Sequence, residues 1–350
     1  MELQPRERRG STPDELKRLR SVEAMLREAR YLPLSWREKK AVLATQAMSK
    51  LAYGWMTRLP NKVELKRIEV AISFALREQL QASVPLRKML RGHSLDPLWR
   101  VLWSNVSAAW RLARTTGGCP CPWSSGGWVA TIERAFDTLG WRGTGEWTWH
   151  HAAMDLTQTL DSQQGLAPSK LFGHHMRESW RRMLWTEFIT SNRRDAQALH
   201  NVPYDTVRVK HARKAFQEQG AHCRAVMSGA AVSDARFMRM RNLPVQSCGW
   251  CNQPDVPSWE HVTWNCSAFA ESRQDVRPQD ALHRILGWPT GPQDGACLRH
   301  LGAVRQALTD QRQPAVNPAG MAPRMCRLSD GPLYMPWPWA LASRKGLGPQ

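Results

Sequence analysis

Three cysteines and one histidine fall in a 19-residue stretch with a spacing that suits a single metal ion. The pattern is C-x2-C-x9-H-x4-C, and its four members are Cys248, Cys251, His261 and Cys266. Thiolate sulfur and imidazole nitrogen are ligands that zinc binds in a tetrahedron. Because four protein ligands leave no position open for a substrate, the pattern predicts one structural Zn2+.

The residues between these ligands have properties that such a site needs. Gly249 allows the chain to turn tightly between the first two cysteines. Ser258 can cap a short helix that carries Glu260 in its first turn, next to His261. The alternative interpretation is inert core thiols beside an unrelated histidine. Three of the eight cysteines in one short stretch, with a histidine at a suitable distance, favour metal binding.

A second group of possible ligands is less regular. Cys119 and Cys121 lie in a Gly/Pro-rich loop and would need His150 or His151 to complete a metal site. The C-x-C spacing is unusual for zinc ligands. A rigid turn between two helices is therefore the favoured interpretation of this loop.

The whole chain is strongly basic, with a formal net charge of +19 over 350 residues. Such a charge attracts polyanions, so nucleic acid is the expected partner and an anionic membrane surface is the runner-up. The sequence also holds 18 tryptophans against 7 phenylalanines and 4 tyrosines. Tryptophan supplies large apolar surface for a core, and an exposed indole can stack on a base.

Positive charge is concentrated in residues 168–241, which contain 14 Lys and Arg against 6 Asp and Glu. Basic helix faces of this kind are typical of phosphate contacts, although any single Arg there can be ordinary solvated surface. The candidate nucleic-acid-binding residues are Arg177, Arg181, Arg182, Arg193, Arg194, Arg208, Lys210, Arg213 and Lys214.

Helix start signals dominate the chain. Capping boxes predict helices that begin after Thr12 (with Pro13 and Glu15), after Ser35 (with Glu38) and after Asn61 (with Glu64). Further helices are expected from Ser94 to about 113, from about 128 to 139, after Ser169, from Pro203, over 281–286 and over 296–311. Cys297 and His300, three residues apart in the last of these, are interpreted as packing residues.

These elements predict a mostly α fold. It consists of helical bundle segments, a small zinc-stapled loop-helix module and a disordered Pro/Gly-rich tail. The expected segments are a disordered 1–11, a helical 12–80, a Trp-rich helical 81–167, a basic helical 168–247, a zinc module 248–290, a helix in 291–311 and a flexible 312–350.

The chain lacks the marks of a membrane or secreted protein. No run approaches the length of a transmembrane helix, and the charged N-terminus has no apolar segment typical of a signal peptide. The cysteines are too sparse for a disulfide scaffold. An intracellular, reducing location, in nucleus or cytoplasm, is expected.

Short motifs at both ends resemble one protein family. Near the N-terminus they are Leu32-Pro33-Leu34-Ser35, Lys39-Lys40, Tyr53-Gly54-Trp55 and Ala71-Ile72-Ser73-Phe74-Ala75-Leu76. Further along they are Arg193-Arg194-Asp195, Val202-Pro203, Arg224-Ala225-Val226, Gly229-Ala230-Ala231, the Cys–His pattern with Trp259 and Trp264, and Leu286-Gly287-Trp288-Pro289. The first set resembles the thumb and connection, and the second the C-terminal tail, of non-LTR (LINE-type) retrotransposon reverse transcriptases of the kind abundant in dinoflagellates.

The resemblance implies a Cys–His knuckle after a polymerase and maps it onto the four predicted metal ligands. The gap of nine residues is longer than in retroviral knuckles, so the resemblance does not extend to a base-reading role. It also implies RNA or DNA as partner, mainly through phosphates, and a reverse transcriptase core as a further partner.

The polymerase active site itself is absent from this sequence. A reverse transcriptase binds its two metal ions with aspartates, usually in a Tyr-x-Asp-Asp turn, and the chain contains no Asp-Asp pair. We therefore expect a nucleic-acid-binding portion of such a polyprotein without its own catalysis. Two alternatives stay open, a metal-dependent nuclease built from scattered carboxylates and a zinc-stapled scaffold that binds an acidic protein.

Overall fold

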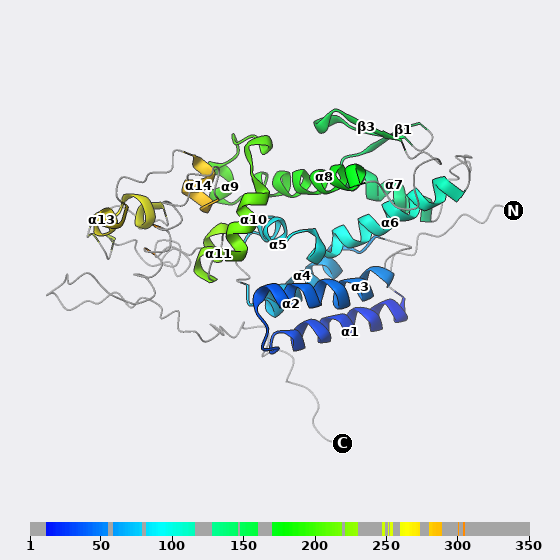
Figure 1. Ribbon diagram of the computed structural model, residues 1–350, viewed down its shortest axis with the longest axis horizontal. Coiled ribbons are helices and arrows are strands. Elements are labelled where there is room, and N and C mark those ends of the chain that lie inside the picture. Colours follow the sequence, from blue (N-terminus) through cyan, green and yellow to red (C-terminus); the bar gives the residue numbers. More distant parts are fainter. Residues whose placement is uncertain are drawn as a thin grey trace, which may run out of the picture.

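The computed structural model describes residues 12–54, 59–78, 82–115, 128–145, 148–159, 170–218, 221–229, 247–248, 251, 253–254, 260–273, 280–288, 300 and 304. This part of the chain is mostly α-helical with one small sheet, which confirms the predicted fold class (Figure 1). The predicted disordered ends at 1–11 and 312–350 lie outside the described residues. No helix in the described ranges is long and apolar enough to cross a membrane.

The first helices begin where the capping boxes predict. Helix α1 (Pro13–Ala29) starts after Thr12, whose hydroxyl accepts the Glu15 N–H at 3.2 Å while the Glu15 carboxylate accepts the Thr12 N–H at 2.8 Å. The boxes of α2 (Trp36–Val42) and α4 (Lys62–Ala75) have the same reciprocal bonds. A π turn (Leu43–Ala47) joins α2 to α3 (Met48–Gly54), so the predicted second helix is one interrupted rod.

Helices α1 to α4 bury their apolar faces against one another and form a first core. Helix α1 packs beside α3 and α4, and α3 also meets α6. Arg67 on α4 donates two hydrogen bonds of 2.8 Å to the Glu23 carboxylate on α1. The buried residues of this first core include Leu19, Val22, Leu26, Leu43, Met48, Leu51, Ile68, Ile72, Ala75, Leu95 and Val101.

The middle of the chain holds α5 (Val84–Arg91), a 3-10 turn (His93–Leu95), α6 (Pro97–Thr115) and α7 (Trp128–Thr138). The prediction that Ser94 caps the helix here is wrong. Ser94 lies inside the 3-10 turn, and α6 starts after Asp96, whose carboxylate accepts the Leu98 N–H at 2.9 Å. Pro97 at the first helical position fixes this later start, because its ring favours N1 of a helix.

A three-stranded antiparallel sheet follows α7, and the sequence patterns did not predict it. Its strands β1 (Arg142–Gly145), β2 (Thr148–His151) and β3 (Leu156–Thr159) pair in chain order. Trp149 of β2 stacks on Phe136 of α7, with ring centroids 4.2 Å apart. The preceding Trp141 is fully buried and donates its indole N–H to Ser179 at 2.8 Å. Both tryptophans are therefore packing residues, as expected, while Trp147 lies outside the described residues.

The basic segment folds into α8 (Lys170–Ile189), α9 (Arg194–Ala198), a 3-10 turn (Tyr204–Thr206), α10 (Val209–Glu218) and α11 (Ala221–Met227). Pro203 does not open the next α-helix as predicted. It precedes the 3-10 turn, and α10 begins only at Val209. The predicted cap Ser169 lies outside the described residues, although α8 starts at the next residue. The chain continues to α13 (Ala270–Arg273) and to α14 (Ala281–Leu286), which was predicted.

A second core gathers around α6 and α8, with α5, α7, α10 and α14 packed on it (Figure 1). Tryptophans fill much of it, and Trp180 donates its indole N–H to Asp96 at 2.6 Å. Its largest buried side chains include Trp99, Trp110, Trp141, Trp180, Trp185, Trp288, Phe136, Phe172, Phe188 and Phe216. Trp36 of α2 and Leu59 pack against both cores, so the two share one boundary.

Candidate metal centre and basic surface

The structure brings the four predicted metal ligands together. The Sγ atoms of Cys248, Cys251 and Cys266 and a ring nitrogen of His261 all lie within 4.8 Å of one another. Cys248 Sγ is 4.0 Å from Cys266 Sγ, and Cys251 Sγ is 3.3 Å from His261 Nε2. Sulfurs about 2.3 Å from a tetrahedral ion are about 3.8 Å apart, so the donor spacing suits one bound ion.

A π turn positions the last two members of this cluster, His261 and Cys266. Residues His261–Asn265 form it, and the Cys266 N–H donates to the His261 carbonyl at 2.6 Å. In an α-helix, residues five apart would be rotated by about 140° from the same face. The wider turn, closed by an i→i+5 bond, instead brings the two ligands of H-x4-C to one side. The predicted cap Ser258 lies outside the described residues.

Hydrogen bonds prepare the cysteine sulfurs for a cation. Burial raises the pKa of the Cys251 thiol, but hydrogen bonds from the backbone of Gln253, from the neighbouring thiols and from the backbone of Ser267 outweigh burial and lower it. Burial raises the pKa of the Cys266 thiol to about 12, against an opposing backbone hydrogen bond from Ala268. A metal ion therefore has to displace a proton from Cys266, while Cys251 already has donors that stabilise a thiolate.

The cluster is enclosed and anchored to the rest of the fold. Cys248 and Cys266 have no exposed surface, and Phe269 and Val304 pack on them. Trp264, within the π turn, donates its indole N–H to the Arg284 carbonyl of α14 at 3.0 Å. The neighbouring Trp288 donates to the Met227 carbonyl at 2.7 Å, which ties α14 to α11.

The donor set fits one metal ion held for structural purposes. Four protein donors surround one point, and three of the four residues are buried. His300 is a neighbour rather than a ligand, because its Nε2 lies 2.6 Å from the Thr263 carbonyl and its ring packs on Trp264. This packing role is the one predicted for His300, while Cys297 lies outside the described residues.

The second possible metal group finds no support in its histidines. His150 Nδ1 is 3.2 Å from the Thr157 hydroxyl across the β2–β3 pair, and His151 is buried edge-on against Trp141. Cys119 and Cys121 lie outside the described residues. In the ranges given above, the Cys–His cluster is the one group of three or more candidate ligands close enough to hold an ion.

Three of the predicted nucleic-acid-binding arginines form ion pairs within the fold. Arg181 pairs with Glu178 at 2.9 Å, and Arg182 pairs with Asp205. Arg193 pairs with Asp195 at 3.0 Å and also donates to the Gly229 carbonyl. Arg181 is only 7% exposed. The Arg181 pair lies within α8, the Arg182 pair joins α8 to the Tyr204–Thr206 turn, and Arg193 joins the start of α9 to Gly229.

Of the six remaining predicted cations, three lie on α10 (Lys210, Arg213 and Lys214), and Arg208 directly precedes this helix. Its Val209, Ala212 and Phe216 are buried in the second core. Arg208, Lys210 and Lys214 are exposed on the opposite side. The side chain of Arg194 lies outside the described residues, although its backbone begins α9. We call Arg208, Lys210 and Lys214 the α10 basic face.

The last two predicted cations, Arg177 and Arg213, are partly buried and have neighbours that sequence reasoning missed. Burial and the nearby Arg181 lower the pKa of both guanidiniums. The charge of Arg213 also lowers the pKa of Lys40 on α2 and of His93. Nothing in the sequence links Lys40 or His93 to the basic segment, since they are far away along the chain and only the fold brings them close.

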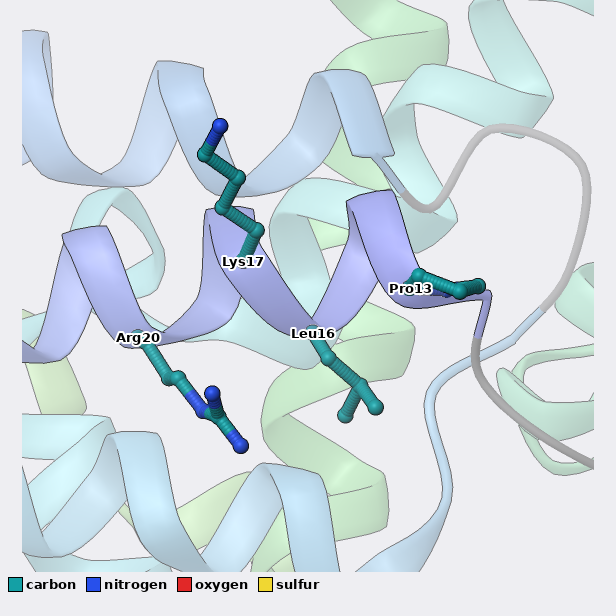
Figure 2. A pocket seen from close by; sticks show the side chains of 4 residues that line it. All are labelled: Pro13, Leu16, Lys17 and Arg20. Atoms are coloured by element: carbon teal, nitrogen blue, oxygen red, sulfur yellow. The ribbon is translucent and has the colours of Figure 1, made fainter.

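Two shallow pockets lie away from the metal cluster. One, of about 370 Å3, is lined by Pro13, Leu16, Lys17 and Arg20 at the start of α1, and Figure 2 shows Lys17 directed away from Leu16 and Arg20. The other, of about 600 Å3, lies between β3 and α8, where the Arg182–Asp205 ion pair forms part of its wall.

Comparison with known proteins adds no identification. No family model matches the sequence, no curated protein matches it, and no solved structure matches the fold. A functional conclusion therefore depends on the metal cluster, the basic surface and the sequence motifs.

Proposed function

We propose that this chain is a nucleic-acid-binding protein stapled by one structural zinc ion. We further propose that it corresponds to the C-terminal portion of a LINE-type reverse transcriptase, without the polymerase active site. The observation that carries the nucleic-acid proposal is the α10 basic face, which presents three cations to solvent on, and directly before, a helix whose other side is anchored in the second core.

Zinc is the metal that the donor set favours. Three thiolates and one imidazole form one of the common structural zinc sets, whereas calcium and magnesium prefer oxygen ligands. When bound, the ion would cross-link Cys248 and Cys251 to the His261–Asn265 turn and Cys266, and it would supply no catalysis. Its function would be to hold α13 and α14 in place beside the basic helices.

Nucleic acid is the partner that the charge distribution favours. Lys and Arg outnumber Asp and Glu by 19 over the whole chain. In the described part of the chain no ion pair engages Arg208, Lys210 or Lys214. Cations on a rigid helix face can contact successive phosphates without reading bases, so the expected binding is largely independent of sequence. A reverse transcriptase core supplied by another chain or segment would then act on the bound strand.

Fluorescence anisotropy with a labelled single-stranded oligonucleotide tests this function. We expect the affinity of the zinc-loaded chain to fall more than about tenfold from low to physiological salt, because bound cations release counterions from the strand. Replacing Arg208, Lys210 and Lys214 by Gln should weaken binding. It should also make the slope of log K against log salt concentration shallower by about two. The matched control replaces the exposed Lys17, Lys62 and Lys66 by Gln. This removes the same number of charges from the surface of the helices that form the first core.

Three results would contradict the proposal. They are salt-insensitive binding of the strand, equal loss of affinity in the two triple variants, and binding of an acidic protein that neither RNA nor DNA can compete away. The last result would favour the scaffold alternative. Cleavage of the oligonucleotide with added magnesium or manganese would favour the nuclease alternative.

A further inference from the structure

Four side chains with positive or titratable groups meet where α2 of the first core faces the second core. Lys40 comes from α2, His93 from the turn after α5, Arg177 from α8 and Arg213 from α10. All four are partly exposed. We call them the Lys40 cluster. The sequence separates its members by up to 173 positions, so the fold alone assembles it.

Direct contacts hold three members of this cluster, Arg213, Lys40 and His93, in place. The Arg213 guanidinium packs on the backbone of Gly92, with its Cζ 2.6 Å from the point that a Cβ on Gly92 would occupy. Lys40 Nζ lies 5.6 Å from the ring centre of Trp36, and Trp36 packs edge-on against Phe216, which is three residues after Arg213 on α10. His93, next to Gly92, packs against Trp99 and Trp180.

Positive charge in this cluster is not balanced by nearby carboxylates. Burial first, and then Arg213, Arg91 and Arg37, lower the pKa of Lys40 to about 8. Burial, and then Arg213, Arg177, Arg181 and Lys40, lower the pKa of His93 to about 4. Each of these charged neighbours is cationic. Lys40 and His93 thus lie in a partly desolvated environment with a positive electrostatic potential.

Four other cations in the fold, in contrast, have a carboxylate partner. Arg91 and Arg87 share the Glu69 carboxylate, Arg181 has Glu178, and Lys88 has Asp96 at 3.4 Å. Lys40, Arg177 and Arg213 form no ion pair or hydrogen bond with any residue in the described ranges, and the buried Arg213 Nε and His93 Nδ1 have no hydrogen-bond partner there. Unpaired cations that lie close together destabilise the fold, because they repel one another. A bound anion would offset this repulsion.

We propose that Lys40, Arg177 and Arg213, which lie near His93, form a binding site for one phosphate group of a nucleic-acid strand. Guanidinium and ammonium groups are the side chains that bind phosphate, and Arg213 lies on the same helix as the α10 basic face. The inference rests on the proposed function for the source of the phosphate. It adds a residue of the first core, Lys40, to a nucleic-acid surface otherwise formed by the second core.

Binding of a labelled oligothymidylate to the full, zinc-loaded chain tests the site. We expect Lys40→Gln and Arg213→Gln each to weaken binding about tenfold, the loss typical of one charged hydrogen-bonding contact. The matched control Lys66→Gln removes an exposed charge from α4 and should stay within about twofold of wild type. Lys40→Gln should melt at a temperature no lower than wild type, since it removes an unpaired, partly buried charge, so its weaker binding is not misfolding.

Trace acetylation of lysines, read by mass spectrometry at about pH 8, provides a second measurement on the unaltered chain. Oligothymidylate should protect Lys40 about fivefold and Lys66 not at all, because a bound phosphate raises the Lys40 pKa and covers the amine. Protection of Lys40 by inorganic phosphate, without any binding of the oligonucleotide, would overturn the proposed function. The cluster would then be a site for free phosphate. Binding that Lys40→Gln and Lys66→Gln affect equally, with no protection of Lys40 by either probe, would overturn the site and leave the function intact.

Discussion

Cys251 differs from the other three candidate metal ligands, because it alone is partly exposed. Its sulfur accepts hydrogen bonds from the backbone of Gln253 and Ser267, which hold it close to His261. A metal ion can thus enter from the side of Cys251 and be closed in by the three buried ligands. These backbone hydrogen bonds fix the sulfur before the ion arrives.

We expect wild-type chain purified without added metal to contain about one zinc per chain, and Cys251→Ser to contain nearly none. Serine keeps the size of the side chain but removes the thiolate that zinc requires. Mass spectrometry of the intact chain under native conditions measures the ratio. Cys326→Ser, a cysteine far from the cluster in sequence, is the control and should retain the ion. Equal zinc content in both variants would show that the four residues are not the ligands.

His93 gives the protein a specific sensitivity to acid. Its pKa is about 4 in the folded chain, because of burial and the surrounding cations, against about 6.5 when unfolded. Between these values the unfolded chain binds a proton that the folded chain does not, so stability is lost as the pH falls from about 6.5 to about 4. The loss should reach about 2 kcal/mol at about pH 5.

His93→Gln, which cannot titrate, should remove this loss. Urea unfolding at about pH 7 and about pH 5 gives the change in unfolding free energy between the two pH values for each chain. The contribution of His93 is the difference between this change in wild type and in the variant. Zinc release at low pH affects both chains and cancels in that comparison. An identical pH dependence for variant and wild type would mean that His93 keeps an ordinary pKa in the fold.

At the residue scale, the sequence predicted the Cys–His cluster because its members are close along the chain. The spacing of Cys248, Cys251, His261 and Cys266 is a local pattern, and the fold preserves it. The Lys40 cluster could not be predicted, because its members come from four separate elements and only tertiary packing removes their water. For the same reason no pattern distinguished Arg181, which pairs with Glu178, from Arg177, which has no such partner.

At the scale of elements, local signals located helices better than turns. Capping boxes are reciprocal bonds within four residues, so the starts of α1, α2 and α4 were predictable. The start of α6 was misplaced because Ser94 and Asp96 are both good caps, and Pro97 decides between them. The sheet was missed because its strands have only four residues each, too few for a clear alternating pattern, and because β1 contains two glycines.

The turn after α5 depends on Gly92, and its replacement should be costly. Gly92 has φ 89° and ψ 165°, a conformation that residues with a side chain rarely adopt, and the Arg213 guanidinium occupies the space of a Cβ. We expect Gly92→Ala to lower the unfolding free energy by about 1–3 kcal/mol. Thermal or urea unfolding measures the change.

Gly173→Ala is the matched control for this substitution. Gly173 lies within α8, and a Cβ there would be 3.3 Å from the mobile end of Arg177. Because alanine favours a helix interior over glycine, this variant should be neutral or more stable by up to about 1 kcal/mol. If both variants destabilise equally, the backbone conformation at Gly92 is not the cause.

At the scale of the whole molecule, the two cores are joined by buried charge as well as by apolar packing. Glu69 on α4 belongs to the helices of the first core, and Arg87 and Arg91 on α5 lie among residues of the second. Arg91 pairs directly with Glu69 and lies 3.7 Å from Glu78, while Arg87 is 3.7 Å from Glu69. Burial raises the pKa of Glu78, so Glu69 is the main counter-charge for both arginines.

Removing that counter-charge should uncouple the two cores. We expect Glu69→Gln to cost about 3–5 kcal/mol, because two arginines would stay buried with one weakly placed carboxylate. For a domain of this size that corresponds to a fall in Tm of roughly 10 °C. Differential scanning calorimetry should show one transition for wild type and, in the variant, an earlier one for the first core.

Glu23→Gln provides the control for Glu69→Gln, since it breaks an ion pair between α1 and α4 whose arginine, Arg67, is 45% exposed. Exposed pairs contribute less than about 1 kcal/mol, so this variant should melt within a few degrees of wild type. The difference between the variants isolates burial, because both replace a paired glutamate by glutamine. Equal melting temperatures would mean that apolar packing at Trp36 and Leu59, rather than the Glu69 ion pairs, couples the cores.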